Sequence, residues 1–412
     1  MTQLSALSSL PARQPARWLA TLALVPRSRL WLALLVATAW PLSCCCEEPE
    51  CGDDVRDPGE LCFLADRLAP ELELATPLAL RAGRFDADEL ADLIVLGTDE
   101  TGVTGRLLVG DGDGGLDDGR RVGVYGCSAY PISGDLGDDG RDDLVFATCT
   151  NSLLVFRGDG DGFAAPIEVP VGVGVRQATI TDVDGDGLRD LLVLGIDGAG
   201  VPNLSFAQSL PDQSLAPAYL TALPVPALPM FTPGMMAAAR IERDGRFDVI
   251  FAEADRASAL YRTHYAGMGS FAAPEPLTID LRPTGLGLRD LDRDDRLDLV
   301  LADRERQQLV GLLADGDDFG DAGYTPLDVA WASLVFGQLD DDGWLDLAVI
   351  DEARVSLLRG VGDGSFAPGT ELEFPAPVVE LTLLDLNLDG RDDLIAGTFT
   401  GDAPLTIALS GP

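Results

Sequence analysis

A nine-residue acidic pattern recurs seven times along the chain, and this recurrence constrains the fold more than any other feature of the sequence. Each copy ends in an aspartate followed by an apolar run, as in "DLIVLG", "DLLVLG" and "DLVLAD". The final aspartates lie 51, 47, 58, 50, 48 and 47 residues apart, and they are Asp92, Asp143, Asp190, Asp248, Asp298, Asp346 and Asp393. A period of about 50 residues predicts one array of similar units rather than several unrelated domains.

Each repeat predicts four short strands. One apolar strand leads into the acidic loop, a second leaves it, and a third ends in a glycine-acid turn such as "GDGDGG" or "GVGDGSF". Four strands in about 50 residues are typical of a β-propeller blade, so seven repeats predict an all-β, seven-bladed propeller of antiparallel blades. The last repeat lacks a fourth strand, and we expect the N-terminal segment Glu71–Pro77 to supply it and close the ring. The alternative is an open solenoid.

The acidic loops resemble FG-GAP/VCBS repeats of integrin-type propellers. The pattern D-x-D-x-D-G-x-x-D-L is complete in "DVDGDGLRDL" from Asp182, and the resemblance extends over residues 71–412. It implies a seven-bladed propeller that binds partners on the face opposite the acidic loops.

The spacing of the acids predicts calcium sites. Ca²⁺ takes six to eight oxygen ligands, and alternate residues of a tight loop can direct their oxygens at one centre. Positions 1, 3, 5 and 9 would supply side chains, position 7 a carbonyl, and position 6 favours glycine because the turn needs a positive φ. The predicted ligands in loops two, three, five, six and seven are Asp135, Asp139 and Asp143; Asp182, Asp184, Asp186 and Asp190; Asp290, Asp292, Asp294 and Asp298; Asp340, Asp342 and Asp346; and Asp385, Asn387, Asp389 and Asp393.

Loops one and four depart from this pattern because they begin with Arg84 and Arg240. We predict that both loops are metal-free, with each guanidinium pairing with the acids of its own loop. Those acids are Asp86, Asp88 and Asp92 in loop one, and Glu242, Asp244 and Asp248 in loop four. For the incomplete loops, plain acidic turns remain the alternative interpretation.

Charge and composition exclude several functions. The chain has 29 basic residues, all of them arginine, against 68 acidic residues, for a net charge of -39. The absence of lysine excludes Schiff-base chemistry, and the scarcity of basic residues argues against nucleic acid as a partner. The single histidine, His264, is expected to be structural. The acidic balance instead favours cations as ligands.

The first 43 residues predict export. Four arginines and no acid precede the apolar run "LWLALLVATAWPLS" and then a cysteine, which resembles a bacterial lipoprotein leader with Cys44 or Cys45 as the lipid-bearing residue. An ordinary cleaved signal or a membrane anchor remains an alternative. Residues 44–70 would be a cysteine-rich tether. "CGDDVRDPGELC" resembles one unit of a myxobacterial surface-protein repeat and implies a Cys51–Cys62 disulfide.

Two further cysteines, Cys127 and Cys149, flank the second acidic loop and can pair if their strands bring them close enough. A disulfide there would fit the oxidising compartment that the leader predicts.

Together these features predict a non-catalytic calcium-binding propeller at the cell surface or outer membrane. It would be held by a lipid anchor, be monomeric, and serve in adhesion, ligand binding or scaffolding with a protein or polysaccharide ligand. An extracellular polysaccharide lyase or hydrolase using the non-metal face is the alternative, and a simple spacer is a third. The Pro-rich segment Leu215–Met236 is interpreted as an outer strand with loose turns, or else as a partner-binding loop anchored by Tyr219 and Phe231.

Overall fold

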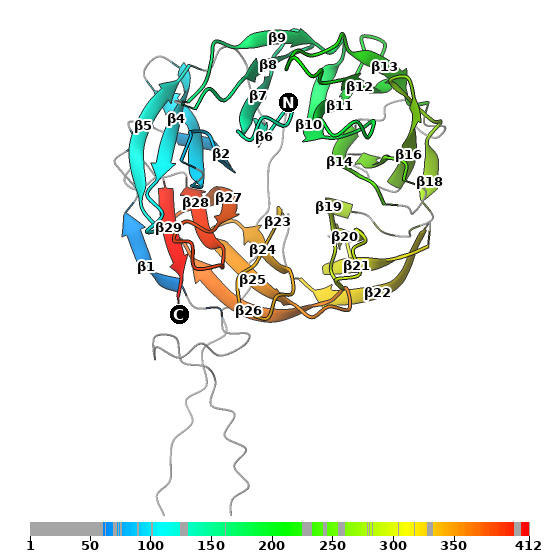
Figure 1. Cartoon of the computed structure of the whole chain (residues 1–412). Coiled ribbons are helices and arrows are strands. Elements are labelled where there is room, and N and C mark those ends of the chain that lie inside the picture. The colour runs from blue at the N-terminus through cyan, green and yellow to red at the C-terminus, as the bar shows by residue number, and fades with distance from the viewer. Residues whose placement is uncertain are drawn as a thin grey trace, which may run out of the picture. The chain divides into compact units, whose positions relative to one another are not determined.

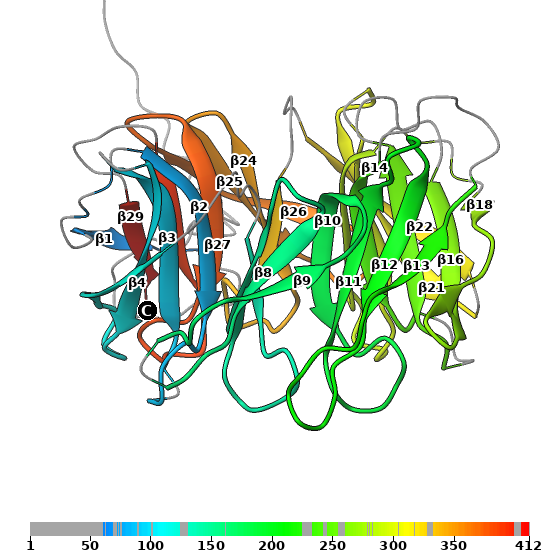
Figure 2. The same ribbon diagram turned by 90° about the horizontal axis from the view of Figure 1, so that it is seen from above.

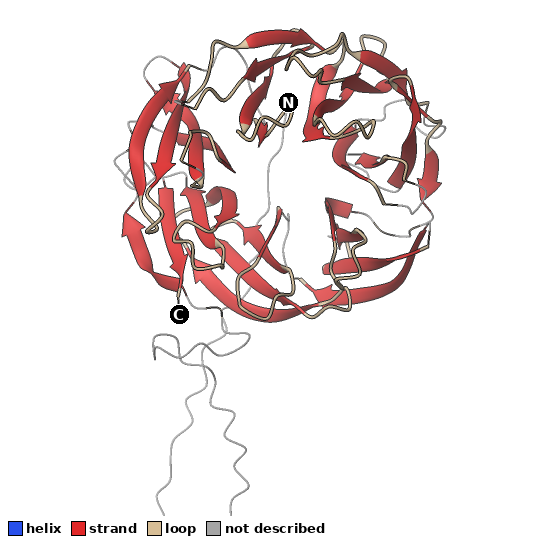
Figure 3. Cartoon of the chain, viewed as in Figure 1, coloured by secondary structure: helices blue, strands red, loops and turns tan. Residues whose placement is uncertain are grey.

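The computed structural model describes residues 61–411 with gaps at 62, 69–71, 73, 75, 89, 100–101, 124–130, 161, 225–232, 242–244, 254–259, 278, 280, 282, 304, 317, 328–332 and 399–404. The described residues form strands, turns and loops (Figure 3). Within these ranges no helix is long and apolar enough to cross a bilayer.

The strands form seven antiparallel sheets arranged as the blades of a β-propeller (Figure 1). Blades one to three are β2 (Thr76–Gly83), β3 (Asp92–Asp99), β4 (Gly102–Gly110) and β5 (Leu116–Val122); β6 (Ile132–Gly134), β7 (Asp143–Ala147), β8 (Ser152–Phe156) and β9 (Ile167–Pro170); and β10 (Gly174–Thr181), β11 (Asp190–Ile196), β12 (Pro202–Ala207) and β13 (Tyr219–Ala222). Blade four is β14 (Pro233–Ala239), β15 (Asp248–Glu253), β16 (Leu260–Gly267) and β17 (Ser270–Phe271), with β18 (Glu275–Leu277) also paired to β16.

Blades five to seven repeat the same strand order. They are β19 (Pro283–Arg289), β20 (Asp298–Asp303), β21 (Gln308–Asp315) and β22 (Asp318–Pro326); β23 (Leu334–Gly337), β24 (Asp346–Asp351), β25 (Arg354–Gly360) and β26 (Phe366–Glu373); and β27 (Val378–Leu384), β28 (Asp393–Thr398), β29 (Leu405–Ser410) and β1 (Phe63–Leu68). The first strand of each blade lies nearest the ring axis in Figure 1, and Figure 2 shows the blades from the side. The predicted seven-bladed all-β propeller is therefore confirmed.

The ring is closed by an N-terminal strand, but not by the segment that the sequence suggested. β1 pairs with β29, with Phe63 opposite Ser410 and Leu68 opposite Thr406, so blue and red strands lie side by side in Figure 1. The prediction of Glu71–Pro77 was wrong, since Thr76 and Pro77 already begin β2 of blade one. Leu74 of that segment is instead buried between blades seven and one. The closing strand thus comes from the range expected to be a tether.

Buried apolar side chains lie between the blades. Successive side chains of a strand point to opposite faces of its sheet. In β3, Leu93 and Val95 pack against blade seven, whereas Ile94 and Leu96 pack against blade two. The buried apolar residues of the described chain form seven such clusters, one at each seam between neighbouring blades. The second strand of each blade is therefore apolar along most of its length, because both of its faces are covered.

The acidic loops and the glycine-acid turns share one face of the propeller, as their positions along the strands predict. Asp86 of loop one forms an isolated bridge with Gly160 of the turn in blade two. Gly114, in the corresponding turn of blade one, donates its N–H to the carbonyl of Leu386 in loop seven at 3.1 Å. In blades one and two the turn therefore contacts the loop of the preceding blade.

The segment Leu215–Met236 contains the outer strand of blade three, as one of its two interpretations predicted. Tyr219 in β13 stacks against Phe206, with 6.5 Å between ring centroids. Phe231 lies outside the described residues, so its suggested role as an anchor stays a prediction.

Candidate metal-binding loops

The ninth aspartate of every acidic loop is a buried hydrogen-bond acceptor that joins three parts of its blade. Each second strand begins at this residue. Its Oδ2 accepts the backbone N–H of the second loop residue, at 2.7–3.3 Å in all seven loops. In six blades its Oδ1 accepts a backbone N–H from the end of the third strand, at 2.7–3.1 Å. In blade four the Nε of Arg262 donates to Asp248 instead, at 3.2 Å.

Burial perturbs these carboxyl groups. It raises the pKa of Asp92, Asp143, Asp298 and Asp346 to about 6 and that of Asp190 to about 7, although the backbone N–H donors act in the opposite direction. The sequence assigned the ninth aspartate to a metal. In this structure both of its oxygens hold the blade together, and a metal can share them only through their remaining lone pairs.

An aspartate at position 1 shapes the rest of its loop. In loop three, Asp182 accepts the N–H of Gly185 through Oδ1 at 2.7 Å and that of Gly187 through Oδ2 at 3.3 Å. The first aspartates of loops two, five and seven accept the N–H groups of their fifth and sixth residues in the same way. Loops one, four and six lack this acid and therefore lack this constraint.

The predicted positive φ at position 6 is confirmed in every loop where that position is described. Five of these residues are glycines, and Asp295 has a φ of 63°. The structure adds a second such position that the sequence did not reveal. Position 4 also has a positive φ in loops two, three, five and seven, where it is Asp138 (57°), Gly185 (83°), Arg293 (61°) and Leu388 (58°). These are the four loops with an aspartate at position 1, which supports one shared loop conformation.

Three loops gather acids closely enough for a cation. Carboxylate oxygens lie within 4.8 Å of one another in three groups: Asp86, Asp88 and Asp92; Asp182, Asp184 and Asp190; and Asp290, Asp292 and Asp294. Two oxygens on one Ca²⁺ can be no more than about 4.6–5.2 Å apart, which is twice the usual Ca–O distance. The spacing and the all-oxygen donor set therefore fit a hard divalent cation.

Loop seven has the same internal hydrogen bonds with an amide at position 3. Asp389 donates its N–H to both Asp385 and Asn387, at 3.1 Å in each case, and Asp389 accepts the N–H of Arg391 at 2.9 Å. The side chains at positions 1, 3 and 5 are thus held as in loop five.

Loop two contains an arginine where the sequence predicted a metal. Nη1 of Arg157, from the end of blade two's third strand, lies 2.7 Å from Oδ2 of Asp143 and also donates to the carbonyl of Leu136. Its Nη2 donates to the carbonyl of Gln213 at 2.8 Å. Asp135, Asp139 and Asp143 therefore share their loop with a cation supplied by the protein, so this loop fits a metal poorly.

Among the described residues of loop four, Asp248 pairs with a different arginine from the predicted Arg240. Arg240 lies 3.7 Å from Asp182 of loop three and over the ring of Phe247, whereas Asp248 pairs with Arg262. Glu242 and Asp244 lie outside the described residues.

Arg84 also differs from the prediction. Its backbone N–H donates to Asp142 of loop two at 2.8 Å, and no ion pair among the described residues joins it to the acids of loop one. Both arginines diverge from the expectation because the loops of neighbouring blades lie closer to them than the sequence could show.

Loop six has features both of the loops that fit a metal and of loop two, whose acids are paired with an arginine. Asp340 is buried, and its Oδ2 has no hydrogen-bond partner among the described residues. Burial raises the pKa of Asp340, and the nearby charge of Arg359 partly offsets this effect. Asp342 accepts the N–H of Trp344 at 2.7 Å, which fixes the turn.

The loops differ in one residue at the end of the third strand. It directly precedes the residue whose backbone N–H donates to Oδ1 of the ninth aspartate. It is Arg157 in blade two, Gln208 in blade three and Arg359 in blade six, while blades one, five and seven have Val109, Leu313 and Leu409. Gln208 donates to Asp184 at 2.6 Å. The signal was visible in the sequence as an arginine directly before the glycine of "FRGDG" and "LRGVG".

The cysteine predictions remain untested. Cys44, Cys45, Cys51, Cys62 and Cys127 lie outside the described residues. Cys149 is described, in the turn after β7, but its predicted partner is not. The lipidation and both disulfides therefore stay predictions.

Comparisons with known proteins agree with this architecture. A family model for the FG-GAP-like repeat matches residues 135–193 and 338–396, which contain loops two and three and loops six and seven. No curated protein matches the chain.

Two solved structures are similar in fold, both titled as crystal structures of BBS1N in complex with ARL6DN, one soaked with lead and one with mercury. They have TM-scores of 0.56 and 0.55, with 13% and 12% identity, and each comparison covers 87% of this chain and 98% of the other. The chain is thus a seven-bladed β-propeller that carries FG-GAP-like repeats.

Proposed function

We propose that this protein is a non-catalytic ligand-binding or scaffolding propeller whose acidic loops bind Ca²⁺. The propeller fold with its FG-GAP-like repeats supports the module. One observation carries the metal: in loops three, five and seven the first three ligand side chains are fixed by N–H groups of their own loop. Crowded carboxylates repel one another, and a bound cation makes the same crowding favourable.

The proposed sites are not equivalent. Loops three, five and seven have an aspartate at position 1 and no arginine at the third-strand position. Loop one gathers three acids but has Arg84 in place of the first, so we propose a weaker site there. Loops two and four are neutralised by Arg157 and Arg262, and loop six by the charge of Arg359. When bound, Ca²⁺ would be structural.

Calcium titration with matched variants tests this proposal. Unfolding midpoints of the full chain would be compared in EDTA, in calcium and in magnesium. A site at a hundredfold excess over its Kd stabilises by about 2.7 kcal/mol. Asp186→Ala and Asp389→Ala should each remove part of the calcium-dependent gain. Asp139→Ala is the matched control, because it changes the same loop position in the loop that holds Arg157.

The outcome of this comparison is decisive. Equal losses in all three variants, or a midpoint that calcium does not move, would mean that the loops are acidic turns held by hydrogen bonds and arginines. Calcium counted by titration calorimetry gives the second readout, and three strong sites are expected.

The absence of catalysis is part of the proposal. The carboxyl groups with the most raised pKa values are the ninth aspartates, whose oxygens are engaged with backbone N–H groups rather than directed into a pocket. This arrangement supports a structural role for them and disfavours the alternative of a polysaccharide lyase or hydrolase. A screen of uronate-containing polysaccharides for new reducing ends or unsaturated products would test this.

We further propose export and lipid anchoring through Cys44 or Cys45, on the support of the leader sequence alone. Mass spectrometry of the membrane-extracted protein and of its Cys44→Ala and Cys45→Ala variants would identify an acylated residue. Unmodified cysteines in the extracted protein would exclude the anchor.

A further inference from the structure

The outer seam between blades four and five is hollowed into a cavity of about 810 Å³. Elsewhere in the ring a regular fourth strand covers the outer edge, but in blade four this role is divided between the two residues of β17 and the three of β18. The apolar cluster of this seam ends in partly buried side chains, among them Leu277, Ile279 and Leu281. The cavity is therefore a consequence of the shortened outer strand of blade four.

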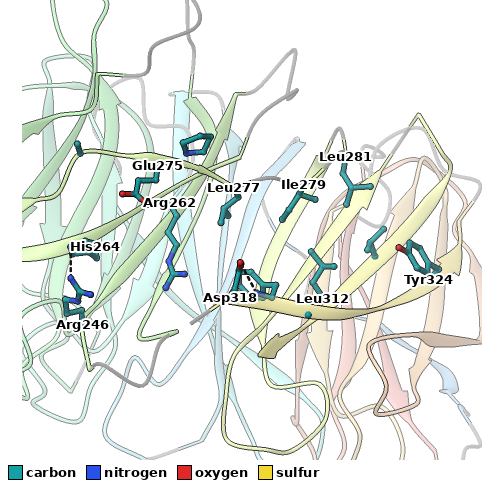
Figure 4. A pocket seen from close by; sticks show the side chains of 15 residues that line it. Arg246, Arg262, His264, Glu275, Leu277, Ile279, Leu281, Leu312, Asp318 and Tyr324 are labelled. Atoms are coloured by element: carbon teal, nitrogen blue, oxygen red, sulfur yellow. Dashed lines mark hydrogen bonds between the residues drawn. The ribbon is translucent and has the colours of Figure 1, made fainter. Parts of the chain in front are cut away.

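The two ends of this cavity are lined by different kinds of side chain. Figure 4 shows Arg246, Arg262 and His264 on the blade-four side, Leu277, Ile279 and Leu281 in the middle, and Leu312 and Tyr324 on the blade-five side. In a chain with 68 acids and 29 arginines, two guanidinium groups and the single histidine meet here. One end of the cavity thus carries two guanidinium groups and a histidine, and the rest is mostly apolar apart from Glu275 and Asp318 (Figure 4).

Both guanidinium groups are held in place by neighbours. Arg262 is oriented by Asp248, with contacts of 3.2 Å from Nε and 3.1 Å from Nη2. Nη1 of Arg246 lies 2.9 Å from Nε2 of His264. Arginine can only donate, so Nε2 accepts and the ring proton of the neutral histidine is on Nδ1. Groups that are already oriented lose little conformational entropy when a ligand binds.

The charges at the mouth limit which anions can enter. Glu275 and Asp318 are exposed and also line the cavity. Together with Asp248 they outnumber the two arginines by one charge, so an anion with several charges is disfavoured here. A single carboxylate can still use the fork of a guanidinium group, which carries five N–H donors in a fixed plane.

We propose that this cavity binds a small monocarboxylate with an aliphatic or aromatic body, its carboxylate on Arg246 and Arg262 and its apolar part on Leu277, Ile279 and Leu312. The volume lies in the range of sites for small organic ligands. The site is on the outer rim of the ring and does not depend on metal binding by the acidic loops.

The test is calorimetric titration of the full chain with matched probes, with and without calcium. The probes are 4-phenylbutyrate, 4-phenylbutylamine, 4-phenylbutanol and inorganic phosphate. Saturable binding of 4-phenylbutyrate with a Kd of about 1 mM is expected for a ligand of this size. The amine and the alcohol should bind at least about tenfold more weakly, because a charge-assisted hydrogen bond to a guanidinium is lost. Phosphate should also bind at least about tenfold more weakly, because it has no apolar part to pack on the leucine and isoleucine side chains.

Two variants locate the site. Arg246→Gln should weaken 4-phenylbutyrate about tenfold. Arg141→Gln should not, although it changes the same loop position in blade two. Ile279→Asn tests the apolar wall and should weaken the acid and the alcohol alike. Equal affinity in the Arg246→Gln and Arg141→Gln variants, tighter binding of the amine or phosphate, or no saturable binding of the acid would each overturn the proposal.

Discussion

Replacing Asp292 with asparagine should stabilise the protein in EDTA and reduce its stabilisation by calcium. Asp292 is the third residue of loop five, and its Oδ1 accepts the N–H of Asp294 at 3.2 Å. Loop seven has Asn387 at this position, and its Oδ1 accepts the N–H of Asp389 at 3.1 Å. The variant should therefore keep the turn, because an asparagine already makes the same hydrogen bond elsewhere in this ring.

The expected magnitude follows from the spacing of the charges. Burial, and then the charge of Asp294, raise the pKa of Asp292, so its ionised form is disfavoured in the folded protein. Carboxylate oxygens of Asp290, Asp292 and Asp294 lie within 4.8 Å of one another. Two unit charges at that distance repel by about 1 kcal/mol in water. Because the loop is largely exposed and Asp294 is partnered by Arg296, we expect a gain of about 1 kcal/mol in EDTA.

Calcium should reverse the effect. At a hundredfold excess over Kd, one site contributes about 2.7 kcal/mol, and a tenfold loss of affinity reduces this to about 1.4 kcal/mol. Urea unfolding in EDTA and at fixed free calcium would measure both terms. Asp117→Asn removes the same charge from an exposed position in β5 and corrects for the change in net charge. Equal destabilisation by Asp292→Asn in both conditions would refute the reasoning, since it would make the carboxylate only a turn former.

Three further predictions concern the frame of the ring. Gly311→Ala places a Cβ 2.1 Å from the carbonyl oxygen of Gly364, across the seam of blades five and six, and should cost about 1–3 kcal/mol of stability. Gly198→Ala is the control, because the added Cβ has open space and should not destabilise the protein. Urea unfolding midpoints would measure both. Arg391→Gln removes a bidentate pair between the buried arginine and the half-exposed Asp341 (3.0 and 2.7 Å) and a bond to the carbonyl of Gly411 (2.7 Å), and should cost about 2 kcal/mol or more. The same change at an exposed arginine should cost under about 1 kcal/mol in the same assay. Five of the buried ninth aspartates (Asp92, Asp143, Asp190, Asp298 and Asp346) have pKa values raised from 3.8 to about 6 or 7 and therefore bind more protons in the folded state. In EDTA their contribution to stability is full below about pH 4 and is lost as pH rises through about 6–7; a free energy of unfolding that instead rises between pH 5 and 7.5 would contradict this sign.

The sequence predicted the parts of this structure that depend on local pattern. The seven-fold recurrence predicted the blades, and the aspartate at each ninth position marked the first residue of each second strand. A positive φ was predicted at position 6 of the loops, and Asp295, which replaces glycine there in loop five, adopts it. These features are encoded within about ten residues, where turn chemistry and alternation of side chains act directly.

The remaining features depend on contacts between distant segments. β1 was missed because "FLADRL" directly follows Cys62 and has no acidic loop of its own, while its partner β29 lies more than 300 residues away. The cationic partners of the loops were missed for the same reason. Arg157 follows Asp143 by 14 residues and reaches it only because the second and third strands pair.

The placement of arginine, rather than the number of acids, sorts the loops of this ring. Loops two and three share positive φ values at positions 4 and 6 and a hydrogen bond from the sixth N–H to the first aspartate, yet one has Arg157 beside its ninth aspartate and the other has Gln208 beside its third residue. Loop two contains its own counter-charge at 2.7 Å from Asp143, whereas loop three receives only a longer contact of 3.7 Å, from Arg240 across the seam. Arg240 of blade four also contacts Asp182 of loop three, so a cation in that loop would act on the seam between two blades as well as on one turn.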